Sequence, residues 1–310
     1  MSALICGSMA YDTIMVFGDK FKNHILPDSV HMINVSFLVP EMRRETGGCA
    51  GNIAYNMKLL GEEPVIMATV GEDFDPYTKW LVECCIERMH IKRIDESYTA
   101  QAFITTDMDD NQITAFHPGA MSFSHENRVT DAKGISIGIV SPDGRDGMIE
   151  HAAQFVEAKI PFIFDPGQGL PMFNGEELLT FVEQATWLTV NDYEGRMLQE
   201  RTGRSLEELA AMVEALIVTK GGEGSDIYVD GQIIEIPTAK VAELNDPTGC
   251  GDAFRAGLIY GIEHKYDWDV TGRIASLCGG IKIEHHGTQN HKYSIETFHQ
   301  RYRDSFGSDF

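Results

Sequence analysis

Short apolar runs alternate with amphipathic stretches along most of the chain, and this alternation limits the folds that it can adopt. The apolar runs are rich in β-branched and aromatic residues, and several end directly at Gly, Pro, Asp or Asn, as buried strands do. The predicted strands are 3–6, 64–70, 136–140, 161–164, 187–190 and 216–219. The predicted helices are 51–60, 77–88, 147–158, 175–184, 193–200 and 206–214. This order predicts an α/β fold with a mostly parallel sheet between two layers of helices.

Two segments interrupt the alternation, residues 13–42 and 98–118. The second contains AFITT and QITAF on either side of MDDN, a pattern that predicts a β-hairpin. We expect both insertions to form a small β lid over the carboxyl ends of the main strands, where ligands bind in such sheets. An antiparallel edge of the main sheet is the alternative. Because no linker divides the chain, we expect a single domain over residues 1–310.

The charge of the chain excludes several classes of partner. Its 310 residues include 47 acidic and 25 basic side chains, which gives a formal net charge of −22. Binding along nucleic acid or on an anionic membrane surface requires basic patches. No stretch approaches the ~18 apolar residues of a membrane span, and the N-terminal sequence lacks the basic start of a secretory signal. We therefore expect a cytoplasmic protein with a small-molecule substrate, no nucleic-acid partner and no membrane.

The most informative motif is a glycine-rich turn that leads directly into an apolar helix. The turn lies within residues 245–257 (NDPTGCGDAFRAG), and the helix is predicted over 253–262. Gly249 and Gly251 let backbone N–H groups approach a ligand, and a helix start adds unpaired donors, so this turn predicts an anion hole for a phosphate. Asp252 beside it is either a helix cap or a general base. Because a capping carboxylate would compete with phosphate for the same amides, we favour the base.

Three further turns carry polar or glycine residues. GGCAGN at 47–52 allows a ligand to approach the backbone closely, or it is a tight strand-to-helix turn. Asn191 and Glu194 share one face of a first helical turn, where the charge of Glu194 favours the helix N-terminus. Taken by itself, TKGGEG at 219–224 predicts a hairpin turn into residues 226–229.

Together these motifs resemble the ribokinase-like (PfkB) family of carbohydrate and nucleoside kinases. Residues 246–257 are similar to the C-terminal signature of the family, and residues 47–52 to the N-terminal signature. The resemblance runs from about residue 3 to 300 and is nearest to the bacterial adenosine kinases. It includes GSMAYD at 7–12, LP at 26–27, VSFLV at 35–39, TTD at 105–107, FHPGAM at 116–121, NDYE at 191–194 and GTQ at 287–289.

The resemblance implies a ribokinase-like three-layer α/β/α fold with a β lid, and an ATP-dependent adenosine kinase that makes AMP. Asp252 would be the catalytic base, and the amides of Gly249, Cys250 and Gly251 would form the anion hole. Phe116 would stack on adenine. The other residues expected at the nucleoside are Ser8, Asp12, Ser36, Gly48, Asn52 and Gln168.

The same resemblance places the second substrate and the ions. The residues expected at ATP are Asn191, Thr219, Lys220, Gly221, Gly222 and Gly224. Glu194 would organise Mg²⁺ through water. Asp246, Thr248 and the loop at 282–288 would resemble the monovalent-cation site of these kinases, and K⁺ is the ion expected there.

The chain departs from the resemblance at one side of the adenine slot. Ala102 occupies the position of a second stacking aromatic, and Phe103 points to the other face of its strand and cannot replace it. In a monomer, exposed lid strands that carry Phe37, Leu38 and Val39 would leave an apolar sheet edge open to pairing with another chain. We therefore expect a homodimer through the lid. The alternatives are a ribokinase- or fructokinase-type sugar kinase and a non-catalytic nucleoside-binding protein.

Overall fold

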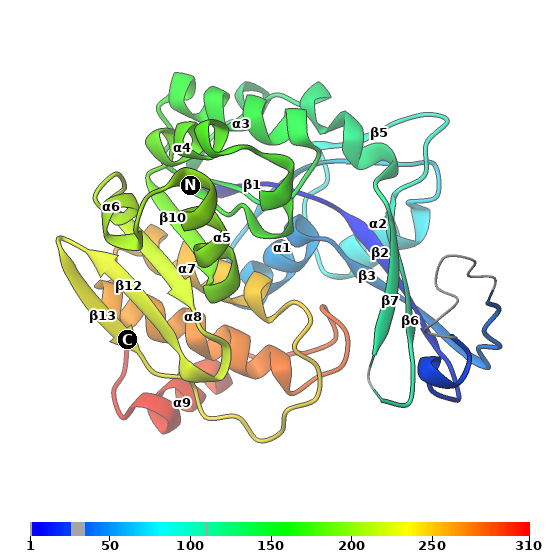
Figure 1. Cartoon of the computed structure of the whole chain (residues 1–310). Coiled ribbons are helices and arrows are strands. Elements are labelled where there is room, and N and C mark those ends of the chain that lie inside the picture. Colours follow the sequence, from blue (N-terminus) through cyan, green and yellow to red (C-terminus); the bar gives the residue numbers. More distant parts are fainter. Residues whose placement is uncertain (1, 26–34, 110) are drawn as a thin grey trace.

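A nine-stranded sheet forms the body of the protein in a computed structural model that describes residues 2–25, 35–109 and 111–310 (Figure 1). Its strand order is β13-β12-β11-β10-β9-β8-β1-β4-β5. Neighbouring strands run parallel except at β12, which pairs antiparallel with β11 and β13, so the prediction of a mostly parallel sheet is confirmed. The strands are β1 (Ser2–Cys6), β4 (Val65–Val70), β5 (Ile91–Arg93), β8 (Ile135–Val140), β9 (Phe162–Phe164), β10 (Trp187–Asn191), β11 (Ala215–Thr219), β12 (Ser225–Val229) and β13 (Gln232–Ile236).

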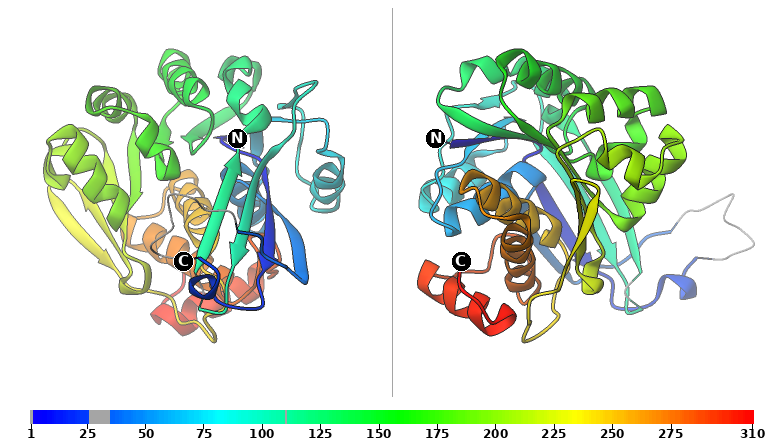
Figure 2. Two further views of the ribbon diagram at one scale, coloured as in Figure 1. Left: turned by 45° about the vertical axis from the view of Figure 1, so that its right-hand side comes forward. Right: turned by 90° about the vertical axis from the view of Figure 1, so that its left-hand side faces the viewer.

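Helices cover both faces of this sheet, as Figure 2 shows. In β1, Ala3 and Ile5 belong to the apolar core on one face, whereas Leu4 and Cys6 belong to the core on the other. The first face is covered by α1 (Cys49–Leu59), α2 (Asp75–Glu83), α7 (Cys250–Glu263) and α8 (Trp268–Ile283), and α9 (Ile295–Phe306) packs on α8. The opposite face is covered by α3 (Arg145–Ala158), α4 (Gly175–Gln184), α5 (Asp192–Thr202) and α6 (Leu206–Ala210). The three-layer α/β/α prediction is confirmed.

The predicted and observed helix bounds differ by four residues or more at two C-termini and by no more than three elsewhere. The helix predicted over 77–88 ends at Glu83, where Cys84 caps it and Cys85 takes a φ of 56°. The helix predicted over 206–214 ends at Ala210. Within the described residues, no helix is long and apolar enough to cross a membrane.

A separate four-stranded sheet extends from one end of the body (Figure 1). Its order is β3-β2-β6-β7, and β6 and β7 form the predicted hairpin. The strands are β2 (Ala10–Val16), β3 (Glu41–Gly47), β6 (Ala100–Thr106) and β7 (Gln112–His117). β2 begins at Ala10, with only three residues between it and the end of β1, so the small sheet starts earlier in the chain than the predicted insertion at 13–42.

The segment at 35–39 differs from its prediction as an exposed strand. It forms no strand, and Phe37 packs against Phe17 and Phe21 with ring centroids 4.8 and 4.9 Å apart. The Phe37 side chain is therefore covered by aromatic packing and not by pairing of strands, whereas the Leu38 side chain remains exposed. The LP motif at 26–27 lies outside the described residues.

Candidate active site

Two loops approach each other closely where the large and small sheets join. Ser8 lies between β1 and β2, and Gly48 lies between β3 and α1. The amide of Cys49 donates to Ser8 Oγ at 3.2 Å, and the amide of Ala50 donates to the Ser8 carbonyl at 3.0 Å. Gly48 has a φ of 85°, and a Cβ there would lie 2.5 Å from the Ser8 carbonyl oxygen. Only glycine permits this approach.

Asp252 lies in the first turn of α7 and is held by a hydrogen-bond network from α1. Its Oδ2 accepts from Asn52 Nδ2 at 2.8 Å. Asn52 Oδ1 in turn accepts from Gln289 Nε2 at 2.9 Å. The Gln289 side chain also accepts from Trp80 Nε1 at 2.7 Å and donates to the Tyr77 hydroxyl at 2.6 Å. This network fixes the Asn52 amide with its NH₂ group toward the carboxylate. The sequence did not predict the other members of the network as site residues; they are Gln289, Trp80 and Tyr77.

The electrostatics of Asp252 suit a base that works near neutral pH. Burial raises the pKa of Asp252 to about 6, although the hydrogen bond from Asn52 and the charge of Arg255 oppose that rise. The carboxylate is therefore ionised at pH 7 but more basic than an exposed one. It does not cap α7, because the N-cap position is Gly249 and no side chain in the described part of the chain caps the helix there. The capping alternative for Asp252 is wrong.

The start of α7 presents the backbone donors that an anion requires. Among the described residues, the amides of Gly249, Gly251 and Asp252 have no hydrogen-bond acceptor. The Cys250 amide differs from its prediction, because it donates to the Pro247 carbonyl at 3.2 Å. Gly249 has a φ of 79°, and a Cβ there would lie 2.9 Å from Thr288. The donors available to a phosphate are thus those of Gly249, Gly251 and Asp252.

One face of the small sheet carries the predicted sugar and base contacts. Asp12 is the cross-strand partner of Ala102, and Ala102 is the partner of Phe116, so the three side chains share a face. Burial raises the pKa of Asp12 to about 6, with smaller contributions from Glu45 and Asp246. Phe116 is 53% exposed beside the small Ala102. Phe103 lies on the opposite face, as expected.

Asn191 and Glu194 cap α5 reciprocally. The Asn191 side chain accepts from the Glu194 amide at 2.7 Å, and Glu194 Oε2 accepts from the Asn191 amide at 2.8 Å. This capping box fixes both side chains at the carboxyl end of β10, where Asn191 is paired with Thr219 of β11. Burial, and then the charge of Asp165, raise the pKa of Glu194. In the described part of the chain Glu194 Oε1 has no partner, and this oxygen fits a water-mediated Mg²⁺ contact.

A buried ion pair links these strand ends to α7. Arg255 donates from Nε and Nη2 to the two carboxylate oxygens of Asp165, at 2.9 Å each. Arg255 Nη1 also donates to the Gly251 carbonyl at 3.2 Å. Burial alone would lower the pKa of Arg255, but the carboxylates of Asp165, Glu194 and Asp252 outweigh this effect and raise that pKa. Sequence analysis missed this pair, and its only signal was an arginine one helical turn after Asp252.

The remaining predicted residues lie in less constrained places. Lys220 Nζ donates to Asp226 Oδ1 at 2.6 Å within its own hairpin, as the turn interpretation implied. Gly221 and Gly222 form an open turn after β11, and Gly224 ends it with a φ of 90°. Ser36 and Gln168 are exposed, and neither side chain has a hydrogen bond to another described residue.

The predicted cation residues form part of the loop before α7. Asp246 Oδ1 accepts from the Thr248 amide and Oδ2 from the Gly287 amide, both at 2.9 Å. Burial would raise the pKa of Asp246, but these donors hold it below its ordinary value. No group of three or more His, Cys, Asp or Glu side chains in residues 2–25, 35–109 and 111–310 is arranged to hold a metal ion.

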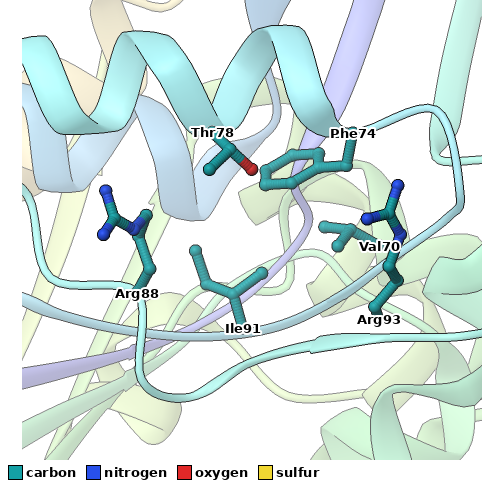
Figure 3. Close-up of a pocket in the computed structure, with 6 residues that line it drawn as sticks. All are labelled: Val70, Phe74, Thr78, Arg88, Ile91 and Arg93. Atoms are coloured by element: carbon teal, nitrogen blue, oxygen red, sulfur yellow. The ribbon is translucent and has the colours of Figure 1, made fainter.

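A small pocket on the protein surface is separate from this site. Figure 3 shows that it lies between α2 and the segment that carries β5. It contains none of the predicted site residues. The residues that line it are Val70, Phe74, Thr78, Arg88, Ile91 and Arg93.

Comparison with known proteins shows which family the chain belongs to. The profile of the pfkB family carbohydrate kinases matches residues 12–294. The nucleoside kinase of Methanocaldococcus jannaschii is 33% identical over 258 residues, which cover 83% of this chain and 85% of that protein. The nucleoside kinase of Burkholderia thailandensis, solved in complex with inosine, is 48% identical with a TM-score of 0.91 and 99% coverage of both chains.

More distant structures share the architecture alone. The ribokinase of Thermotoga maritima is 20% identical, with a TM-score of 0.79 over 98% of this chain and 99% of that one. The profile match covers most of the chain, and it includes both the N-terminal glycine turn at α1 and the turn that carries Asp252. The chain therefore belongs to the pfkB family of carbohydrate kinases.

Proposed function

We propose that the protein is an ATP-dependent nucleoside kinase that converts adenosine to AMP by phosphorylating its 5′-hydroxyl. The observation that carries this proposal is the placement of an ionisable Asp252 beside three amides at the start of α7 that have no acceptor among the described residues. A base and an anion cradle at one helix terminus are what phosphoryl transfer to an alcohol requires. A protein that only bound nucleosides would need neither group.

In the proposed reaction, Asp252 takes the proton of the 5′-hydroxyl as that oxygen attacks the γ-phosphorus of ATP. The bond between the γ-phosphorus and the bridging oxygen breaks, and ADP leaves. The amides of Gly249, Gly251 and Asp252 stabilise the charge on the transferring oxygens. Asn52 keeps the carboxylate of Asp252 oriented. When bound, Mg²⁺ would neutralise phosphate charge, and Glu194 is the residue that would hold it through water.

The shape of the small sheet supports a nucleoside rather than a free sugar as substrate. Asp12 would accept hydrogen bonds from the ribose hydroxyls, and Phe116 on the same face offers an aromatic surface to a base. A ribose or fructose kinase has no use for such a surface. Inosine is a second candidate, because the Burkholderia thailandensis nucleoside kinase has been solved with inosine and with ADP-inosine.

A panel assay tests the proposed substrate. ADP release is measured with adenosine, inosine, ribose and fructose at matched concentrations. We expect kcat/KM to be highest for adenosine, with inosine next and the two sugars far below. Preference for inosine would overturn the assignment of adenosine but keep the nucleoside kinase. Preference for either sugar would overturn both.

We also propose that the chain is one domain over residues 1–310 whose small sheet closes over the nucleoside, and that it forms a homodimer through that sheet. The face of the sheet away from Asp12 carries exposed apolar side chains, which a partner subunit would cover. They are Met42, Phe103 and Ile113. Light scattering of the wild type and of Phe103→Asp tests the dimer. A monomeric mass for the wild type would overturn it.

A further inference from the structure

A lysine ammonium is surrounded by oxygen atoms of two loops, one of which leads into the predicted anion hole. Lys282 belongs to α8, which packs along α7 (Figure 1), and its side chain is fully buried. Its Nζ donates to the carbonyl oxygens of Asp246 at 2.7 Å and His285 at 3.1 Å. Asp246 Oδ2 lies 3.9 Å from the same nitrogen. A buried ammonium persists only where it is paired and hydrogen-bonded, and these three oxygens provide for it.

The oxygens around Lys282 come from two loops that bound the site. Asp246 lies in the loop that enters α7, and His285 lies in the loop that follows α8. The Asp246 carboxylate accepts from the Gly287 amide of the second loop and from the Thr248 amide of its own. The ammonium thus joins the two loops through Asp246 and His285. The contacts of Asp246 extend to Thr248, the residue before Gly249, whose amide is the first of those without an acceptor among the described residues.

These oxygens belong to Asp246 and to the loop at 282–288, which the sequence predicts to be part of a K⁺ site. Carbonyl and carboxylate oxygens are suitable ligands for a hard cation. Here the Lys282 nitrogen already occupies hydrogen-bonding distance of two of those carbonyls. Burial lowers the pKa of Lys282, and the Asp246 carboxylate counteracts part of that effect. The residues present therefore fit an internal ammonium better than an added ion.

We propose that the Lys282 ammonium replaces a monovalent cation at these oxygens, so that the kinase works without K⁺ and Lys282 acts as a positioning residue for the anion cradle. This inference rests on the proposed kinase function. Its physical content is that a positive charge must sit between the Asp246 and His285 carbonyls to hold the start of α7. A free cation should then substitute for the side chain once the side chain is removed.

The test compares the wild type with Lys282→Ala in chloride salts of K⁺, NH₄⁺ or tetramethylammonium at equal ionic strength. We expect wild-type turnover to change less than ~2-fold between the salts, and Lys282→Ala to lose at least ~10-fold in tetramethylammonium. K⁺ or NH₄⁺ should restore most of that loss. Lys79→Ala, which removes an exposed lysine from α2, is the control and should match the wild type in every salt.

Thermal melting supplies a readout that does not depend on turnover. K⁺ should raise the Tm of Lys282→Ala but not of the wild type, because only the variant has a cation site to fill. Strong K⁺ activation of the wild type, or a folded Lys282→Ala that no cation rescues, would overturn the inference. If the alanine variant does not fold, Lys282→Ser, whose short side chain also leaves room for a cation at these oxygens, takes its place. A wild type inactive on every nucleoside would instead refute the proposed function, and the melting comparison would still decide the cation question.

Discussion

Replacing Asp252 by Asn should lower the catalytic turnover but raise the free energy of unfolding. The substitution keeps the shape of the side chain and an oxygen that can accept from Asn52, but it removes the charge that would take the proton. Turnover should therefore fall at least ~100-fold with little change in nucleoside affinity. The fold should become more stable, because the native protein holds this carboxylate in an environment that disfavours ionisation.

The size of the stability gain follows from the pKa. A pKa of about 6 instead of 3.8 means that ionised Asp252 costs the folded state about 3 kcal/mol at pH 8. Partial exposure of the side chain reduces this to about 2 kcal/mol. The folded state binds the extra proton between the two pKa values, so this cost is absent below pH 3.8, grows as pH rises and is complete above about pH 6. At pH 5 the gain from the substitution should be about half that at pH 8.

Melting curves of the two proteins at pH 5 and pH 8, with circular dichroism to confirm the fold, measure this difference. For a chain of this size we expect Asp252→Asn to raise the Tm by about 3 °C at pH 8, and by less at pH 5. A Tm that falls at pH 8 would mean that the carboxylate is stabilised by its neighbours, and the assignment of a raised pKa would be refuted. Near-normal turnover would remove Asp252 from the role of base.

Three further outcomes are expected. Gln289→Leu should lower kcat roughly 10-fold while KM changes little, because it frees the Asn52 amide to turn away from the base; an unchanged kcat in steady-state assays would contradict the network. Phe116→Ala should raise the KM for adenosine roughly 10-fold, whereas Phe103→Ala on the other face should not, and equal effects of the two would refute base stacking. The kcat/KM for adenosine should fall below about pH 6 as Asp252 is protonated, and a flat profile down to pH 5 would argue against that group.

Local patterns were enough to predict most of the sheet and the two glycine-rich turns. β10 and β11 are compact apolar runs, and the helix predicted over 175–184 is the observed α4. By contrast α8 was missed, because its glycines depress helix propensity although they let the helix pack tightly. Gly257 of α7 illustrates this packing, since a Cβ there would lie 2.6 Å from Ala275 of α8.

The site was predictable where one segment carried it and not where distant segments meet. The anion cradle and Asp252 lie within a few residues of each other, so spacing alone indicated them. The contact of Asn52 with Asp252 spans 200 positions, and that of Gln289 with Asn52 spans 237. Burial of Lys282 was likewise invisible, since a lysine in an apolar helix usually keeps its charged end in water.

The joint between the two sheets has a mechanical consequence. The strands β1 and β2 are separated only by residues 7–9, which include Ser8, and β3 passes into α1 through Gly48. Two of the four chain connections between the small sheet and the body therefore lie where the sugar would bind, and the other two are the segments before β6 and after β7. Any change in the angle between the two sheets would move backbone atoms at the sugar site, so a bound nucleoside that contacts Ser8 and Gly48 would favour one orientation of the small sheet over others.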